Sequence, residues 1–302
     1  MNGSTPRLRL PHRRTPYGAL LLASALWLLL LAPGSGLAFT LLFGKWDDPT
    51  PGTPAVVTWG FIAPGAGIAP IAPVAWSGTN TLGSGDPLLD PRARIDAVHG
   101  AGAFDAALER AFATWAAATN VTFVRVADSA GDFAGVTSPD IRIGAWAFGD
   151  PAAGAGFGPP GNDLLFPDAL AGDLALDHED LFTIAVGGEG DAIPRLAGAI
   201  LNDLESLMLH EIGHTLGLGH SDVVDGVMCG FIPGDPFDPG DCVGEVIRRQ
   251  LRADDVAGIR ALYGAPATPV PMSSPFALGL LALALACFAA QRIAPRRRRR
   301  TG

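Results

Sequence analysis

Hydrophobic positions along this chain follow two periods, and each period predicts a different kind of element. In residues 103–119 an apolar side chain recurs every three or four positions, which is the spacing of one buried helical face. We expect a helix there, ended by Asn120 in the left-handed conformation. Runs of β-branched and aromatic residues predict strands at 55–61, 121–126 and 140–146, the second of them largely buried.

The stretches between these elements are predicted to be mainly loop. Residues 64–90 and 147–181 are rich in Gly, Pro or Asp, which favours irregular backbone. Short extended pieces are expected at 164–166, 174–176 and 182–186.

Two more helices are predicted in the last third of the 302-residue chain. The first runs from Asn202 to about Leu216, because Asn202 and Glu205 have the spacing of a capping box. The second spans residues 253–263. It begins with two aspartates, which suit the helix dipole, and Gly264 follows its last residue as a C-cap.

Residues 1–38 are predicted to be a secretory signal peptide. The segment contains no acidic residue, and its four arginines all precede the apolar run 19–32. The small residues Gly36 and Ala38 then mark a signal-peptidase cleavage after Ala38. The alternative is an uncleaved membrane anchor.

Residues 265–302 form a second targeting segment. A Pro-rich linker leads to the apolar run 276–290 and then to five consecutive arginines, a charge cluster that favours the cytoplasmic side of a membrane. This order resembles the PEP-CTERM sorting tails of exported bacterial proteins, although the Pro-Glu-Pro signature is absent. A plain C-terminal anchor is the alternative. Either reading implies membrane contact through this segment or its processing, and places 39–264 outside the cytoplasmic membrane, extracellular or at the cell surface.

The central domain, 39–264, is strongly acidic. The two ends hold 4 + 6 = 10 of the 21 basic residues and none of the 30 acidic residues, so the domain carries 11 − 30 = −19. Such a surface repels phosphate, and we expect no nucleic-acid partner. Of the three cysteines, Cys287 lies in the apolar tail, whereas Cys229 and Cys242 could form a disulfide that the sequence alone leaves open.

Residues 210–220 read His-Glu-Ile-Gly-His-Thr-Leu-Gly-Leu-Gly-His. On a helix, His210 and His214 project from the same face and can share one Zn²⁺. Gly217 permits a turn that brings His220 back as the third ligand. Three protein ligands leave a fourth position open, as in catalytic zinc sites. Glu211 is then placed to hydrogen-bond a water rather than to bind the metal.

Two alternatives compete with a catalytic site. The histidines could be ordinary hydrogen-bonded side chains, or the chain could be a surface-anchored zinc module that binds a partner without cutting it. Glu211 separates the last alternative from an enzyme, because a structural zinc site has no use for a carboxylate at that position.

The motif H-E-x-x-H-x-x-G-x-x-H resembles that of the metzincin zinc endopeptidases. Ser221 after the third histidine, Met228 at the position of the Met-turn, and residues 251–264 as a closing helix resemble the matrixin branch. The resemblance implies an α+β fold with a twisted, mainly parallel sheet, two long helices, a zinc cleft and a small C-terminal subdomain. It also implies a monomeric endopeptidase that cleaves proteins or peptides, with Met228 as apolar support under the metal.

Departures from the matrixin pattern change what is expected of the metals. Residues 141–177 contain no His or Cys, and Ala175 stands where the family has a histidine, so we expect one catalytic zinc and no structural zinc. Asp177 and Asp180 match carboxylates that bind calcium in the family, with a solvated acidic loop as the alternative. No Cys precedes Cys229, so we expect no cysteine-switch propeptide and activity without its removal.

Overall fold

The computed structural model describes residues 39–42, 44–70, 76–127, 130–149, 152–161, 168–199, 201–230 and 246–267. The predicted signal peptide, the C-terminal tail, the extended piece at 164–166 and Cys242 lie outside these ranges. In the described part of the chain, no helix is long and apolar enough to cross a membrane.

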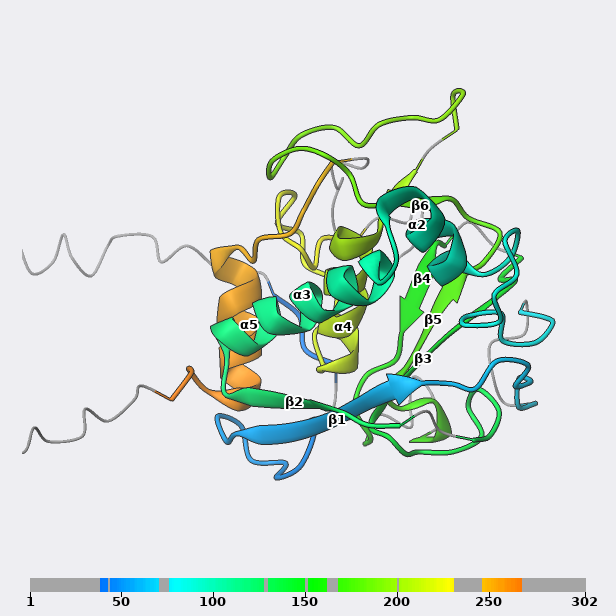
Figure 1. Ribbon diagram of the computed structural model, residues 1–302. Coiled ribbons are helices and arrows are strands. Elements are labelled where there is room, and N and C mark those ends of the chain that lie inside the picture. Colours follow the sequence, from blue (N-terminus) through cyan, green and yellow to red (C-terminus); the bar gives the residue numbers. More distant parts are fainter. Residues whose placement is uncertain are drawn as a thin grey trace, which may run out of the picture.

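A five-stranded sheet in the order β2-β1-β3-β5-β4 organises the domain (Figure 1). Four strands are parallel: β1 (Ala55–Phe61), β2 (Val121–Arg125), β3 (Ile141–Trp146) and β5 (Asp173–Asp177). The short edge strand β4 (Gly154–Gly156) pairs with β5 in the antiparallel direction. The predicted mainly parallel sheet is therefore confirmed.

The described residues form four α-helices, and all four contribute to the main core cluster, whereas the second cluster contains no residue from them. They are α2 (Pro91–His99), α3 (Ala103–Ala118), α4 (Leu204–Thr215) and α5 (Ala253–Tyr263). A 3₁₀ turn (Asp168–Leu170) precedes β5, and β6 (Phe182–Thr183) pairs with β7 (Asn202–Asp203) in a separate two-stranded sheet. Helices α3 and α4 lie side by side (Figure 1), and the Trp115 indole of α3 donates a 2.8 Å hydrogen bond to the Leu209 carbonyl of α4.

Both faces of the central strands are buried. Because alternate side chains point to opposite sides of a sheet, neighbouring residues of one strand enter different clusters. Leu174 and Leu176 of β5 enter the main core with Trp115 and Ile212 of the helices. Ala175, between them, belongs to a second cluster with Ile62, Phe133, Ala134, Trp146, Phe148 and Leu170.

Several predicted elements need correction. The strand at 121–126 is not largely buried, since β2 is an edge strand and exposes Thr122, Val124 and Arg125. Asn120 has no positive φ, because α3 ends at Ala118 and Thr119 is extended. The loop predicted at 147–181 contains β4 and the complete strand β5, and the extended piece predicted at 182–186 is the two-residue strand β6.

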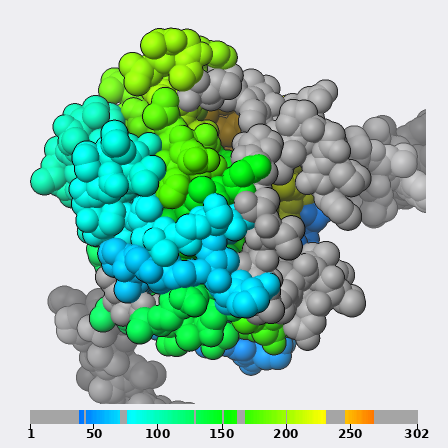
Figure 2. Space-filling view, turned by 90° about the vertical axis from the view of Figure 1, so that its right-hand side faces the viewer, coloured from blue at the N-terminus to red at the C-terminus, as the bar shows by residue number. Residues whose placement is uncertain are grey.

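Helix α2 was not predicted, although Asp90 and Pro91 give its start the usual residues. The Asp90 carboxylate accepts a 2.9 Å hydrogen bond from the Arg92 N–H, and Pro91 occupies the first helical turn. At the other end, His99 Nε2 lies 3.2 Å from the Ile184 N–H. The residues after β6 thus pack next to segment 76–99, and Figure 2 shows them in light green beside the cyan and teal residues of that segment.

Candidate metal centre

The N-cap of helix α4 is Asp203, one residue later than the predicted Asn202. The Asp203 carboxylate accepts hydrogen bonds from the Ser206 N–H (3.0 Å) and hydroxyl (2.6 Å), whereas the Asn202 side-chain amide bonds Asp180. The predicted Asn202–Glu205 capping box is therefore wrong. The physical role is the same, because Asp203 satisfies a free N–H of the first turn.

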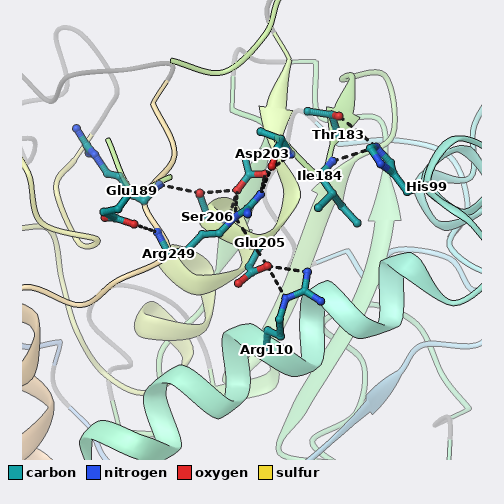
Figure 3. Close-up of polar contacts among 11 residues, drawn as sticks. His99, Arg110, Thr183, Ile184, Glu189, Asp203, Glu205, Ser206 and Arg249 are labelled. Carbon is teal, nitrogen blue, oxygen red and sulfur yellow. Dashed lines mark hydrogen bonds and ion pairs between the residues drawn. The ribbon is translucent and has the colours of Figure 1, made fainter. Parts of the chain in front are cut away.

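Two arginines fix this helix start from opposite sides (Figure 3). Arg249 donates to Asp203 through Nε (2.9 Å), and Arg110 forms a 2.7 Å ion pair with Glu205. Burial opposes ionisation of Asp203, but the hydrogen bonds from Arg249 and Ser206 outweigh it and lower the pKa of its carboxyl group. A fixed start gives a fixed register, so His210 and His214, about two and three turns further along α4, have defined directions.

Three histidines converge beyond that start. His214 Nε2 lies 3.0 Å from His210 Nε2 and 3.2 Å from His220 Nε2. Among the described residues, this is the only group of three or more His, Cys, Asp or Glu side chains close enough to share a metal ion. The structure thus brings together the three ligands that the sequence predicts.

The protonation of this cluster suits a cation. His210 Nδ1 donates to the Val227 carbonyl (2.7 Å) and His214 Nδ1 to the Leu218 carbonyl (2.8 Å), since carbonyls only accept. Each Nε2 therefore presents a lone pair toward the other histidines. Burial, followed by the neighbouring His220, lowers the pKa of His210 to about 4. Neutral imidazoles oriented through Nδ1 are the usual zinc donors, so the residues fit this metal.

Gly217 ends α4 and returns the chain toward His220. Its φ is +102°, its N–H donates to the His214 carbonyl (2.8 Å), and the Leu218 N–H donates to the Gly213 carbonyl (3.0 Å). These two bonds form a Schellman motif. The turn predicted from the glycine is confirmed.

Residues 39–42 hold the His220 loop from outside the helix. Leu42 N–H donates to the Gly217 carbonyl (2.8 Å), and Gly219 N–H donates to the Thr40 carbonyl (3.0 Å). The Thr40 hydroxyl donates to the His220 carbonyl (2.5 Å). The start of the domain therefore stabilises the loop that carries the third histidine.

Met228 packs beneath α4 and is 2% exposed. A Cβ atom placed on Gly213 would lie 2.3 Å from Met228 Sδ and 2.9 Å from Trp115 Cζ2. The glycine inside the motif is thus required for Met228 to approach the helix. The supporting role of Met228 under the metal stays a prediction.

Asp254 and Asp255 have a role that sequence reasoning missed. Asp255 Oδ2 accepts from the Val227 N–H (3.0 Å), Asp255 Oδ1 accepts from the Met228 N–H (3.0 Å), and Asp254 accepts from the Ser221 hydroxyl (2.6 Å). The sequence suggested only a favourable dipole for these aspartates. Their burial, at 5% and 1% exposure, comes from tertiary packing that no local pattern reveals.

Glu211 is also buried, at 5% exposure. Burial raises the pKa of its carboxyl group to about 8, while a backbone hydrogen bond from Gly156 of β4 acts in the opposite direction. A carboxyl group tuned toward neutral pH beside a metal-binding cluster has the properties of a general acid–base group.

The predicted calcium ligands lie at and just after the end of β5, where the guanidinium of Arg94 from α2 already binds the backbone. Arg94 Nη2 donates to the carbonyls of His178 (2.9 Å) and Asp180 (3.0 Å). Asp177 accepts from the Glu179 N–H (2.9 Å), and Asp180 accepts from the Asn202 amide (3.3 Å). Calcium binding by Asp177 and Asp180 stays a prediction.

Two further sequence predictions meet the structure at single residues. Ala175, where the family pattern has a histidine, is fully buried in the apolar second cluster. Cys229 is disulfide-bonded, but Cys242 lies outside the described residues, so their pairing stays a prediction.

Comparison with known proteins places this site in a family. Residues 96–264, more than half of the chain, match the family model described as Matrixin. The chain is 35% identical to Metalloendoproteinase 5-MMP of Arabidopsis thaliana over 156 residues, which cover 51% of this chain and 38% of that protein. It is 32% identical to Matrilysin of Rattus norvegicus over 164 residues, covering 53% and 50%. The chain spans half or less of the length of these relatives, but the match to the family model shows that it belongs to the matrixin family.

Proposed function

We propose that this chain is a zinc-dependent endopeptidase that hydrolyses peptide bonds of protein substrates. The observation that carries the proposal is the convergence of three histidine Nε2 atoms beside the buried carboxyl group of Glu211. Membership of the matrixin family supports it, as do relatives named metalloendoproteinases. The name matrilysin describes that relative and fixes no substrate for this chain.

In this proposal His210, His214 and His220 hold one Zn²⁺. When bound there, zinc would act as a Lewis acid that polarises the scissile carbonyl and activates a water molecule. Glu211 accepts the proton from the attacking water and delivers it to the leaving amine. The ionised form of Glu211, which the first step requires, is favoured beside a cation. Met228 keeps the floor of the site apolar.

The test is hydrolysis of casein or gelatin by the purified protein, with and without a chelator. We expect cleavage that stops on chelation and returns with zinc. Glu211→Ala should abolish cleavage and retain the metal, whereas Glu109→Ala, with a side chain 57% exposed, serves as the matched control. A wild-type protein that binds zinc but cleaves neither substrate, and whose zinc binding is unchanged by Glu211→Ala, would instead favour the noncatalytic zinc module.

We also propose that the chain is exported and that its C-terminal segment tethers it to the membrane or is processed there. Cleavage after Ala38 would turn the Phe39 nitrogen into an ammonium group. That nitrogen lies 3.0 Å from Asp254 Oδ1, and Asp254 is buried beside the His220 loop, so the new charge would have a partner. Mass spectrometry of the protein recovered outside the cell tests this: a chain that begins at Phe39 supports the proposal, and retention in the cytoplasm contradicts it.

A further inference from the structure

The edge strand β4 approaches the helix of the zinc motif at Glu211. A Cβ atom placed on Gly154 would lie 3.1 Å from Cγ, 3.2 Å from Oε1 and 3.3 Å from Cδ of Glu211. A Cβ atom on Gly156 would lie 2.3 Å from the backbone oxygen of the same residue. Both glycines have an ordinary φ, so contact with Glu211 is what restricts them to glycine.

The register of β4 turns these two residues to the same side. Asp177 N–H donates to the Ala153 carbonyl (2.9 Å) and Phe157 N–H donates to the Asp173 carbonyl (3.0 Å). In an antiparallel pair, residues 153, 155 and 157 therefore direct their backbone groups to β5, while Gly154 and Gly156 direct theirs to the free edge. On this side the Gly156 N–H acts on the Glu211 carboxyl group and lowers its pKa, against the larger effect of burial.

The residue between the glycines shows the contrast. Ala155 faces the opposite side of the sheet, where it packs against the second hydrophobic cluster. The Ala155 methyl group fits on that face, whereas the face toward α4 is formed by Gly154 and Gly156, which have no side chain. The strand Gly154–Gly156 thus has one side for packing and one side for Glu211.

We propose that Gly154 and Gly156 are positioning residues for Glu211. Their lack of side chains lets β4 close against the helix, and this close approach restricts the orientation of the Glu211 carboxyl group. The kinetic part of this inference rests on the proposed function, because it concerns the proton transfer assigned to Glu211. The contact itself does not, and it can be measured without activity.

A double-mutant cycle on thermal stability tests the contact in the zinc-loaded full chain. Gly154→Ala should lower the Tm, because its methyl group meets the Glu211 side chain. In the Glu211→Ala background all three nearest atoms are removed, so the same change should raise the Tm by about 1–4 °C by restricting the unfolded chain. Equal changes in the two backgrounds would overturn the inference.

Two matched controls sharpen the cycle. Gly156→Ala meets backbone atoms of Glu211, which remain after Glu211→Ala, so it should lower the Tm in both backgrounds. Gly188→Ala meets only Asp191 Oδ2 at 3.6 Å, an ordinary contact, so it should change the Tm by the same small amount in both backgrounds and leave activity unchanged. A Gly156→Ala penalty that disappears in the Glu211→Ala background would contradict the geometry.

Kinetics test the consequence for the reaction. Gly154→Ala should lower kcat about 10–100-fold with KM changed less than about twofold, because a displaced carboxylate affects the transition state more than binding. Zinc content should stay at the wild-type level. Unchanged kcat, or a loss explained by lost zinc, would overturn the positioning role. If the wild-type protein cleaves no peptide, the proposed function fails, while the stability cycle still decides the contact.

Discussion

Replacement of Asp255 by Ala should loosen the floor of the metal site from a distance. The Asp255 carboxylate is 1% exposed and accepts three backbone N–H groups, from Val227 (3.0 Å), Met228 (3.0 Å) and Arg252 (2.7 Å). The Val227 carbonyl in turn accepts the 2.7 Å bond from His210 Nδ1. One carboxylate on α5 is therefore linked through a single peptide unit to a predicted zinc ligand.

The magnitude follows from those three bonds. A hydrogen bond to a charged group contributes about 1.5–3 kcal/mol, but bonds that share one acceptor are not additive. We expect Asp255→Ala to lower the free energy of unfolding by about 3–5 kcal/mol, a substantial part of the 5–15 kcal/mol typical of a folded domain. Because the Val227 carbonyl that orients His210 is then held less firmly, zinc affinity should fall about 10–100-fold.

Chemical denaturation of the chelated protein and zinc titration against a competing chelator measure the two effects. Asp225→Ala is the control, because the Asp225 side chain is 66% exposed and lies two residues before Val227. This substitution should change the free energy of unfolding by less than about 0.5 kcal/mol. Asp255→Asn keeps one acceptor oxygen and should give an intermediate loss if Asp255→Ala does not fold. Wild-type zinc affinity in a folded Asp255→Ala protein would refute the link from α5 to His210.

Three other outcomes follow from the site. Elemental analysis should find one tightly bound zinc per chain, because Ala175 lies in an apolar cluster where the family pattern has a histidine, and two zinc ions would contradict this. The metal-free protein should lose stability as the pH falls from about 6.5 toward about 4, because His210 is neutral when folded and takes up a proton when unfolded; a Tm that is flat across this window would show that the histidine is not buried as described. Gly213→Ala should lower the Tm and weaken zinc binding, since its Cβ would lie 2.3 Å from Met228 Sδ, and calorimetry that shows an unchanged Tm would remove Gly213 from the account.

Elements with a strong local pattern could be predicted from the sequence. Strand Ala55–Phe61 and helix Ala253–Tyr263 have the predicted bounds, and helix Ala103–Ala118 is one residue shorter than predicted. Their side chains carry the period of the element, so the signal is present in each segment itself. The zinc motif is of the same kind, because His210 and His214 are brought together by helical spacing alone.

Features that depend on neighbours could not be predicted in this way. Strand Gly154–Gly156 has no apolar period, and its glycines make sense only once Glu211 lies against them. The exposure of Val124 follows from the position of β2 at the sheet edge, which its β-branched sequence does not encode. The roles of Asp254 and Asp255 likewise require the Met228 segment to be folded beside α5.

The central claim is that Glu211 performs proton transfer beside a zinc ion held by three histidines. It is tested most directly by comparing wild-type protein, Glu211→Ala and His214→Ala for cleavage of a quenched peptide and for bound zinc. The account predicts that Glu211→Ala keeps its zinc and loses about 10²–10⁴-fold in kcat, while His214→Ala loses both zinc and activity. A Glu211→Ala protein with zinc bound and near wild-type kcat would contradict it.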